Sequence, residues 1–234
     1  MSEIGSAWRL SVVVPVLNEA AYIVDTLQSL QPLRARGHEL IVVDGGSVDG
    51  TPALAAAFAD RVLAAPQGRA AQMNSGAAAA RGDALLFLHA DTELPADADR
   101  LVREALAGAN RCWGRFDVRI EGRSPLLAVV AFCMNWRSRL TGIATGDQAI
   151  FATRPAFARA GGFPEIALME DIGFSKRMKK LSRPACLFAA ATTSGRRWER
   201  HGVLRTILLM WRLRLAYFLG ARPEELARRY AKQA

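Results

Sequence analysis

The sequence lacks the features that mark disulfide-bonded, zinc-ribbon and membrane-spanning proteins. Its three cysteines, Cys112, Cys133 and Cys186, are isolated and form no CxxC pair, which argues against a disulfide framework or a zinc ribbon. The longest apolar stretches, 126–134 and 207–219, are too short or too interrupted by arginine to cross a bilayer, which needs about 20 apolar residues. No charged-then-apolar leader opens the chain. We therefore expect a cytoplasmic protein without a membrane span.

Charge is distributed unevenly along the chain. Residues 1–110 carry 8 basic and 13 acidic side chains, whereas residues 111–234 carry 23 basic and 9 acidic ones. An acidic first half suits a metal ion, and a basic second half suits phosphates or an anionic membrane surface. No helix-turn-helix, zinc-finger or aromatic RNA-binding signature accompanies the arginines, so we expect no nucleic-acid partner. The length of 234 residues and the apolar content of 51% allow one large domain or two small ones.

Strand and helix patterns alternate in the first half. The apolar runs 10–16, 40–43 and 84–89 predict strands, and 61–65 is predicted as a short strand. One helix is predicted after Asn18, its N-cap, and others are predicted from Thr51 and Arg69. This alternation is typical of an α/β fold with a mainly parallel sheet covered by helices on both faces. Ligands of such sheets bind beyond the carboxyl ends of the strands. Four polar residues each follow a predicted strand and are expected to converge there: Asn18, Glu19, Asp44 and Asp91.

The pattern changes from Trp113 onward. Phe116, Val118 and Ile120 alternate with charged residues, which predicts a strand with one polar face. Further strands are predicted at 148–152 and 185–191, and helices at 125–139, 155–160, 170–181, 202–219 and 223–232. No long linker or repeat interrupts the chain. We predict one domain over 8–200, followed by a helical extension over 201–234.

Several polar residues have both a structural and a chemical explanation. The 44–51 loop (DGGSVDGT) is either a simple turn or a loop whose glycines let the backbone approach a ligand. Asp91 is either a helix cap before Pro95 or a ligand for Mg²⁺ or Mn²⁺, which prefer carboxylate oxygens. Glu170 and Asp171 open a predicted helix, where acids stabilise the helix dipole by about 0.3–1 kcal/mol each regardless of chemistry. No single motif decides between these alternatives.

Five segments in chain order resemble the glycosyltransferase family 2 domain, which has the GT-A fold, and the resemblance covers about residues 8–200. They are 14–19 (VPVLNE), the opening strand and acidic turn; 42–51 (VVDGGSVDGT), the nucleotide-binding loop; 68–76 (GRAAQMNSG), the Asn-x-Gly helix; 86–91 (LFLHAD), the strand ending in a metal-binding Asp-x-Asp; and 169–171 (MED), the Glu-Asp pair. Arg197 and Trp198 are similar to an Arg-Trp element of some members. More narrowly, 45–47, 89–92, 146–148 and 162–165 resemble a subgroup of radical-SAM/selenodomain-associated transferases.

The resemblance implies how a UDP- or GDP-linked sugar would be held. Asp91 would bind the divalent cation, Mg²⁺ or Mn²⁺, that bridges the diphosphate, and Asp44 would face the nucleotide base. The other donor-binding positions would be Pro15, Asn18, Glu19, Gly46, Ser47, Arg69, Asn74, His89 and Ala90. The diphosphate or the acceptor would meet Gly146, Asp147, Gln148, Arg196, Arg197 and Trp198.

The resemblance also implies a metal-dependent, inverting transfer of a sugar, expected to be a hexose. Asp171 would be the general base that takes the proton of the acceptor hydroxyl, with Glu170 beside it. The alternative on the same fold is a protein that binds a nucleotide-sugar without catalysis, or one that works at a membrane surface. A nucleotidyltransferase is disfavoured, because 15–19 (PVLNE) stands where its Gly-rich loop would follow the first strand.

Three departures from the family pattern bear on the site. His89 stands where the family has the first Asp of Asp-x-Asp, and Gly45 stands at the second position of its nucleotide-binding loop. Ser194 stands where the Arg-Trp element has Gln. His89 is then either a second metal ligand or a structural residue at the strand end, and His201 is the other candidate ligand. A single carboxylate binds a cation more weakly, which motivates the non-catalytic alternative.

The last two predicted helices are basic and amphipathic. Large apolar residues recur at helical spacing from Leu204 to Leu219, with Arg205, Arg212 and Arg214 on or beside that face. Three roles fit this pattern: docking on the core with snorkelling arginines, lying peripherally on the inner face of a membrane, or forming a homodimer. The same positive field suits a lipid-linked or otherwise anionic acceptor.

Overall fold

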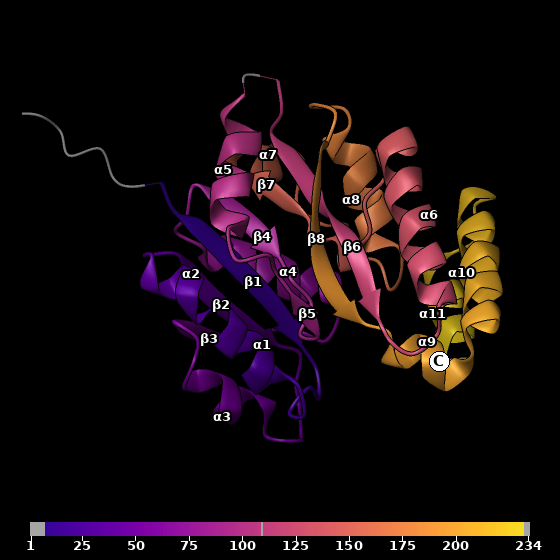
Figure 1. Ribbon diagram of the computed structural model, residues 1–234, viewed down its shortest axis with the longest axis horizontal. Coiled ribbons are helices and arrows are strands. Elements are labelled where there is room, and N and C mark those ends of the chain that lie inside the picture. Colours follow the sequence, from indigo (N-terminus) through magenta and orange to yellow (C-terminus); the bar gives the residue numbers. More distant parts are fainter. Residues whose placement is uncertain (1–7, 109, 232–234) are drawn as a thin grey trace, which may run out of the picture.

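Eight strands form one mixed sheet in the order β3-β2-β1-β4-β7-β6-β8-β5 within the residues that the computed structural model describes, 8–108 and 110–231 (Figure 1). The strands are β1 (Leu10–Val16), β2 (Glu39–Asp44), β3 (Arg61–Ala64), β4 (Ala84–Phe87), β5 (Thr92–Glu93), β6 (Trp113–Glu121), β7 (Phe151–Thr153) and β8 (Ala185–Ser194). Parallel pairing joins β3, β2, β1 and β4, and again β6 and β8, whereas β7 runs antiparallel between β4 and β6. The predicted α/β sheet is confirmed.

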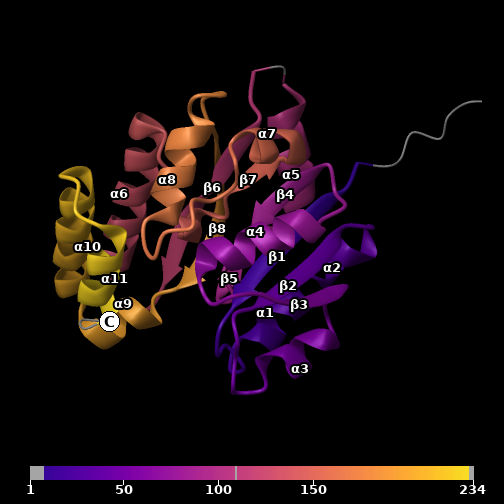
Figure 2. The same cartoon turned by 180° about the vertical axis from the view of Figure 1, so that it is seen from behind.

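Helices cover both faces of this sheet (Figures 1 and 2). They are α1 (Ile23–Ser29), α2 (Gln31–Ala35), α3 (Thr51–Ala56), α4 (Arg69–Ala79), α5 (Ala98–Ala107), α6 (Leu126–Thr141), α7 (Arg154–Arg159), α8 (Glu170–Met178), α9 (Arg196–His201), α10 (Val203–Phe218) and α11 (Pro223–Ala231). One face packs against α1, α3 and α5, and the other packs against α4, α7 and α8. The coverage of both faces explains why the central strands are apolar throughout.

The strand β1 shows this arrangement residue by residue. Val12 and Val14 are buried in the core that includes α1, whereas Val13 is buried in the core that includes α4. Successive side chains of a strand point to opposite faces, so a strand between two cores is mainly apolar. The exception is the buried Ser11, whose hydroxyl donates to Glu39 at 2.6 Å. The run 10–16 therefore has the same bounds in the sequence and in the structure.

Close packing of α4 on the sheet depends on Gly76. A Cβ atom at this position would lie 2.3 Å from Cγ1 of Val13 and 3.0 Å from Cγ2 of Val43. The helix can therefore approach β1 and β2 only because the residue has no side chain. This approach brings the first turn of α4, which begins at Arg69, beside the carboxyl ends of the central strands.

Some elements differ from the sequence prediction. Neither α5 nor α9 is among the predicted helices, although Ala98, Leu101 and Val102 have the helical spacing that indicates α5. The helix α9 is mostly charged and has no apolar periodicity. The strand β8 runs three residues beyond its predicted end, because its last residues pair with β5, where Thr193 lies opposite Thr92.

The helices α10 and α11 pack against the rest of the chain (Figure 2). Leu213 of α10 and Leu226 of α11 are buried in a cluster with Ile143, Met169 and Ile172. One face of the amphipathic tail therefore docks on the core. The helix α9 crosses the predicted boundary at residue 200, and the division into a domain and an extension stays a prediction. In the part of the chain that the structure describes, no helix is long and apolar enough to cross a membrane.

Candidate active site

A cavity of about 990 Å³ lies at the carboxyl ends of β1 and β4, where parallel sheets bind ligands. Its walls come from the turns after these strands, from the first turns of α4 and α8, and from α9, α10 and α11. The structure brings these predicted site residues to its lining: Pro15, Asn18, Glu19, Arg69, His89, Ala90, Asp91, Gly146, Asp147, Glu170, Asp171, Arg196, Trp198 and His201. Residues far apart in the sequence thus converge on one cavity.

Other predicted site residues lie outside this lining: Asp44, Gly46, Ser47, Asn74 and Gln148. The Asp44 carboxylate accepts hydrogen bonds from the backbone N–H groups of Gly46 and Ser47, at 2.9 and 3.0 Å, and from the Ser47 hydroxyl at 2.5 Å. It therefore holds the turn of its own loop, and its contact with a nucleotide base stays a prediction. The side chain of Arg197, also predicted to act here, lies outside the described residues.

Asn74 and Gln148 support loops at the edge of the cavity. The Asn74 amide donates to the Phe163 carbonyl at 2.9 Å and accepts from the Phe163 N–H at 2.9 Å. Gln148 is fully buried, where its Oε1 accepts from the Thr145 N–H at 3.2 Å and its Nε2 donates to Oδ1 of Asn135 at 3.3 Å. Both amides position backbone, because their polar atoms are used by neighbouring segments.

The turn after β1 is tied to the loop after β2. Asn18 adopts a positive φ of 55°, and its Oδ1 accepts from the Val48 N–H at 2.9 Å, while its own N–H donates to the Ser47 hydroxyl at 2.8 Å. The prediction that Asn18 caps a helix was wrong, because α1 begins only at Ile23 and Asn18 is occupied by this loop. The next N–H group, that of Glu19, donates to the Thr51 hydroxyl at 2.9 Å. These bonds hold Asn18 and Glu19 on the cavity wall.

Arg196, in the first turn of α9, links two carboxylates of the cavity. Its guanidinium lies 3.1 Å from Oε2 of Glu19 and 3.4 Å from Oδ2 of Asp91. The same guanidinium stacks over the Tyr22 ring, 3.6 Å from its centroid. All of these side chains stay partly accessible from the cavity, so the cation and the two anions are available to a ligand.

A divalent cation fits this donor set only together with a ligand that supplies further oxygens. Asp91 offers a partly exposed carboxylate, the kind of ligand that Mg²⁺ and Mn²⁺ prefer, and Glu19 lies on the other side of Arg196. Among the described residues, no group of three or more His, Cys, Asp or Glu side chains gathers as a metal cage. Mg²⁺ sites commonly combine one or two carboxylates with substrate phosphates. Asp91 would hold a cation in that way.

The imidazole of His89 is paired with the carboxylate of Asp147. Its Nδ1 lies 3.3 Å from Oδ1 of Asp147, and a Cβ at Gly146 would lie 2.5 Å from its Nε2, so only glycine fits beside the imidazole. Burial raises the pKa of Asp147, but the hydrogen bond and charge of His89, with the charge of Arg69, lower it further, so it lies below its ordinary value. The imidazole therefore helps to order the 146–147 turn on the cavity lining. Metal binding by His89 or His201 stays a prediction.

Asp171 lies at the start of α8 and is oriented by two backbone groups. Its Oδ2 accepts from the Gly146 N–H at 3.1 Å, and its Oδ1 accepts from the Ile172 N–H at 2.7 Å. Beside it, burial and the charge of Asp171 raise the pKa of Glu170, although Arg69 opposes this. Desolvation lowers the pKa of Arg69, but the nearby acids, Glu170 first, raise it above its ordinary value. The site thus combines an oriented carboxylate, a second carboxyl whose pKa is raised, and the positive charge of Arg69.

Backbone strain concentrates around the cavity. Among the described residues, three that are not glycine have positive φ: Asn18 at 55°, Ala149 at 43° and Met169 at 70°. Asn18 and Met169 line the cavity, and Ala149 follows the turn that carries Gly146 and Asp147. Such conformations cost of the order of 1–3 kcal/mol each and cluster at functional sites, where they set the direction of side chains. Met169 in this conformation directly precedes Glu170 and Asp171.

The C-terminal helices contribute cavity residues that were not predicted. Thr206, Met210 and Arg214 of α10 line the cavity at a spacing of four, together with Arg200 of α9 and Tyr230 of α11. The helical spacing of these residues was visible in the sequence, but the sequence did not show that this side of α10 would face the cavity. Only the packing of Leu213 and Leu226 on the core turns it toward the strand ends.

Solved structures with similar folds are bound to nucleotides and nucleotide-sugars. The mannosyltransferase PcManGT from Pyrobaculum calidifontis, in complex with GDP-Man and Mn²⁺, has a TM-score of 0.65 at 21% identity and is matched over 90% of this chain and 62% of its own. S. aureus TarS in complex with UDP-GlcNAc has a TM-score of 0.64 at 18% identity, over 80% and 58% of the two chains. These similarities confirm the predicted GT-A fold.

Sequence relatives point to the same family. An uncharacterized glycosyltransferase of Mycobacterium tuberculosis is 30% identical over 204 residues, which are 81% of this chain and 77% of that protein. A PGL/p-HBAD biosynthesis glycosyltransferase of the same organism is 39% identical over 107 residues, 43% of this chain, and the match spans only 41% of that protein. Residues 11–150 match the family described as Glycosyl transferase family 2. The chain therefore belongs to glycosyl transferase family 2.

Proposed function

We propose that this protein transfers a sugar from a nucleoside-diphosphate sugar to an acceptor hydroxyl, with inversion at the anomeric carbon and with the help of a divalent cation. The observation that carries the proposal is the single cavity whose lining includes Glu19, Asp91 and Arg196, which are joined by ion pairs, together with Asp171. Relatives named glycosyltransferases and similar folds bound to GDP-Man, UDP-GlcNAc or Mn²⁺ support it.

The donor would lie on the side of the first half. Asn18 and Glu19 would border the nucleoside, and the diphosphate would lie between Asp91 and the arginines Arg69 and Arg196. When a diphosphate binds, Arg196 can exchange its carboxylate partners for phosphate oxygens, because its present bonds are to partly exposed groups. The cation, when bound to Asp91, would neutralise part of the diphosphate charge.

The transfer itself would use Asp171. Its carboxylate takes the proton of the acceptor hydroxyl while the hydroxyl oxygen forms a bond to the anomeric carbon. The bond between that carbon and the diphosphate oxygen breaks, and the nucleoside diphosphate leaves with the electron pair. Attack on the face opposite the leaving group inverts the configuration. The Gly146 N–H, bonded to Oδ2 of Asp171, keeps the carboxylate directed at the cavity.

The acceptor side favours a substrate with a phosphate or carboxylate. Arg200 and Arg214 line this part of the cavity. Burial, and then the charge of Arg214, lower the pKa of Arg137 to about 10, and the Nε and Nη2 atoms of Arg137 are buried without a hydrogen-bond partner among the described residues. Arg137 is not among the lining residues, so an anion in the cavity would be bound by Arg200 and Arg214. The closer resemblance to radical-SAM/selenodomain-associated transferases, which implies no settled substrate, stays a prediction.

The test is a thermal-shift series with UDP, GDP, ADP, CDP and dTDP, each with Mn²⁺ or with EDTA. A ligand that binds only the folded state raises its stability by about 2.7 kcal/mol at a hundredfold excess over its dissociation constant. We expect one nucleotide to raise the melting temperature, and to do so more strongly with Mn²⁺. A uniform absence of shifts would contradict the proposal. Stabilisation without sugar transfer to any acceptor would instead favour the non-catalytic alternative.

A further inference from the structure

The helices α6 and α10 lie side by side at one edge of the molecule (Figures 1 and 2). Both helices expose large apolar side chains. We call these side chains the outer face. On α6 they are Leu126, Val129, Phe132, Trp136 and Leu140, and on α10 with its C-cap they are Leu204, Leu208, Trp211, Leu215, Phe218 and Leu219. Each set recurs at spacings of three and four residues, so each forms one stripe along its helix.

The outer face holds most of the exposed large apolar residues of the described chain. Eleven of the fifteen such residues belong to it, with Phe132, Trp211 and Leu140 exposed to 62%, 67% and 80%. Single exposed apolar residues are ordinary on protein surfaces, but a contiguous patch marks an interaction site. No other described segment of the chain packs over these side chains, so we look for their partner in another molecule.

Within α6 and α10 the charges of the outer face have one sign, although the exposed carboxylate of Glu199 on α9 accepts a hydrogen bond from the N–H of Arg123, just before α6. Neither α6 nor α10 contains an aspartate or glutamate, whereas Arg205 and Arg212 are exposed on α10, each one residue after a member of the apolar stripe. One residue along a helix is a rotation of about 100°, so both arginines lie on the same flank of that stripe. Arg123, also exposed, precedes α6. An apolar strip with a cationic flank is complementary to a partner that has an apolar interior beneath a layer of anionic groups.

We propose that the outer face docks on an anionic lipid bilayer. The tryptophan, phenylalanine and leucine side chains would enter the boundary between headgroups and acyl chains, as those of interfacial amphipathic helices do, and Arg205 and Arg212 would contact lipid phosphates. A second copy of the chain fits less well. A two-fold interface brings equivalent helices together, and these helices offer no acid to pair with the two arginines.

Docking would place the cavity close to the lipid surface. The same helix α10 that exposes Leu208, Trp211 and Leu215 outward presents Met210 and Arg214 to the cavity. One helix thickness would then separate the bilayer from the cavity lining. The bilayer proposal rests on the outer face and does not depend on the proposed transfer reaction.

The test is sedimentation of the full chain with vesicles of phosphatidylcholine alone, or of phosphatidylcholine and phosphatidylglycerol in equal parts. We expect binding to the anionic vesicles, weaker binding at high salt and little binding to phosphatidylcholine. The double variant Phe132→Glu/Trp211→Glu is expected to lower the partition coefficient at least about tenfold, and Arg205→Glu/Arg212→Glu to remove the preference for phosphatidylglycerol. Leu54→Glu, on exposed α3, is the matched control and is expected to bind as the parent does.

Three outcomes would overturn the proposal. They are failure of the parent to bind anionic vesicles, binding unchanged by both double variants, and a dimer in sedimentation velocity that Phe132→Glu/Trp211→Glu converts to a monomer without lipid. Circular dichroism checks that the variants fold, which is expected because the substituted side chains are exposed. Nucleotide-dependent thermal shifts should persist in every variant, so failure of the bilayer proposal is distinguishable from failure of the proposed transfer reaction.

Discussion

The two sides of the cavity are built in different ways. On the proposed donor side, short loops after neighbouring strands hold one another: Ala20 N–H donates to Asp49, and Asp49 accepts from the N–H and hydroxyl of Thr51. On the proposed acceptor side, the lining comes from the first turn of α8 and from residues along α9, α10 and α11, which meet only through tertiary packing. The residues of the proposed donor side can therefore be recognised from local sequence motifs. Those of the proposed acceptor side come together only in the folded chain.

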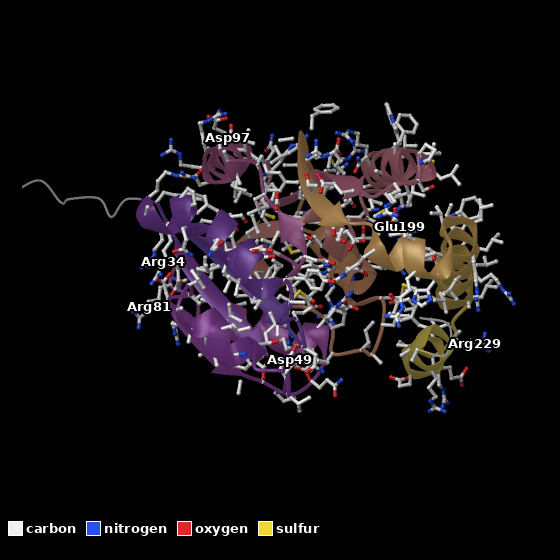
Figure 3. All side chains as sticks on the ribbon, turned by 60° about the horizontal axis from the view of Figure 1, so that its bottom comes forward. Arg34, Asp49, Arg81, Asp97, Glu199 and Arg229 are labelled. Carbon is white, nitrogen blue, oxygen red and sulfur yellow. The ribbon has the colours of Figure 1, made fainter. Side chains whose placement is uncertain are left out.

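The outer surfaces of the first half and of the C-terminal helices also differ, in how their charged residues are paired. Around the first half, charged residues form pairs of opposite sign, such as Arg34 with Asp60 and Asp97 with Arg100. Arg34 and Asp97 lie at the end of the molecule opposite Arg229 of α11 (Figure 3). The helices α6 and α10 carry no acidic residue, and most of their exposed side chains are apolar or basic. Paired charges suit contact with water, whereas an unpaired cationic and apolar surface suits a partner.

The largest expected effect separates chemistry from donor binding. Asp171→Asn keeps the size of the side chain and removes its ability to take a proton. We expect turnover to fall by roughly 10²–10⁴-fold, the usual contribution of a positioned base. Nucleotide thermal shifts should remain, because the donor side is unchanged. Unchanged turnover would show that the base lies elsewhere, and Asp25→Asn on α1 is a matched control outside the cavity.

A packing variant tests the donor side as a rigid unit. Gly76→Ala places a methyl group 2.3 Å from Val13 Cγ1, so β1 and α4 must separate. Overpacking of this kind typically costs about 1–3 kcal/mol, which urea unfolding would measure. Gly108→Ala is the control, because a Cβ there meets nothing within 4 Å and φ is not positive. Equal stability of the two variants would contradict the close approach of α4 to the sheet.

The cation is tested by comparing metal with chelator. Asp91→Ala removes the carboxylate proposed to share the cation with the diphosphate. We expect nucleotide affinity in Mn²⁺ to fall about tenfold, equivalent to about 1.4 kcal/mol, with a smaller change in EDTA. Titration calorimetry would measure both. Asp147→Ala, also on the lining but bonded to His89, is the comparison. An equal loss in Mn²⁺ and in EDTA would remove Asp91 from the metal site.

The sequence predicted the features that depend on short stretches of chain, such as strand bounds and the polar residues that follow the strands. The strand β1 could be bounded because its apolar run is buried on both faces, and the convergence of Asn18, Glu19 and Asp91 followed from the parallel sheet. Side-chain direction was less accessible. Asp44 turns into its own loop and Asn74 bonds to Phe163, because their polar atoms find nearer partners than the cavity. No local pattern shows that competition.

The contribution of the C-terminal helices α9 and α10 to the cavity was largely out of reach for a related reason. The helix α9 reads as a charged segment, so the position of Arg196 between Glu19 and Asp91 depends on contacts more than a hundred residues apart in sequence. The amphipathic pattern of α10 was visible, but the sequence did not say which face meets the core. The buried Leu213 decides that, and it leaves Arg214 in the cavity and Trp211 outside.

The two halves also predict opposite responses of stability to pH. In the first half, desolvation raises the pKa of Asp99, but hydrogen bonds from Arg36 and His38 outweigh this and lower it to about 2. The charged carboxylate therefore stabilises the fold above the unfolded-state value, and this contribution is lost as the pH falls toward about 2. Asp99→Ala should cost about 1 kcal/mol at neutral pH, allowing for solvent screening. Urea unfolding should show the cost shrinking in acid.

Glu170 gives the converse case. Burial, then the charge of Asp171, raise its pKa above the ordinary value of 4.5. A raised folded-state pKa means that the charged carboxylate opposes folding above that pKa, whereas below 4.5 the group is protonated in both states and has no effect. Glu170→Gln should therefore raise the melting temperature at neutral pH, and the gain should vanish in acid. A loss of stability at neutral pH would show that the attraction to Arg69 outweighs burial, and that the acceptor side is held by ion pairs as the first half is.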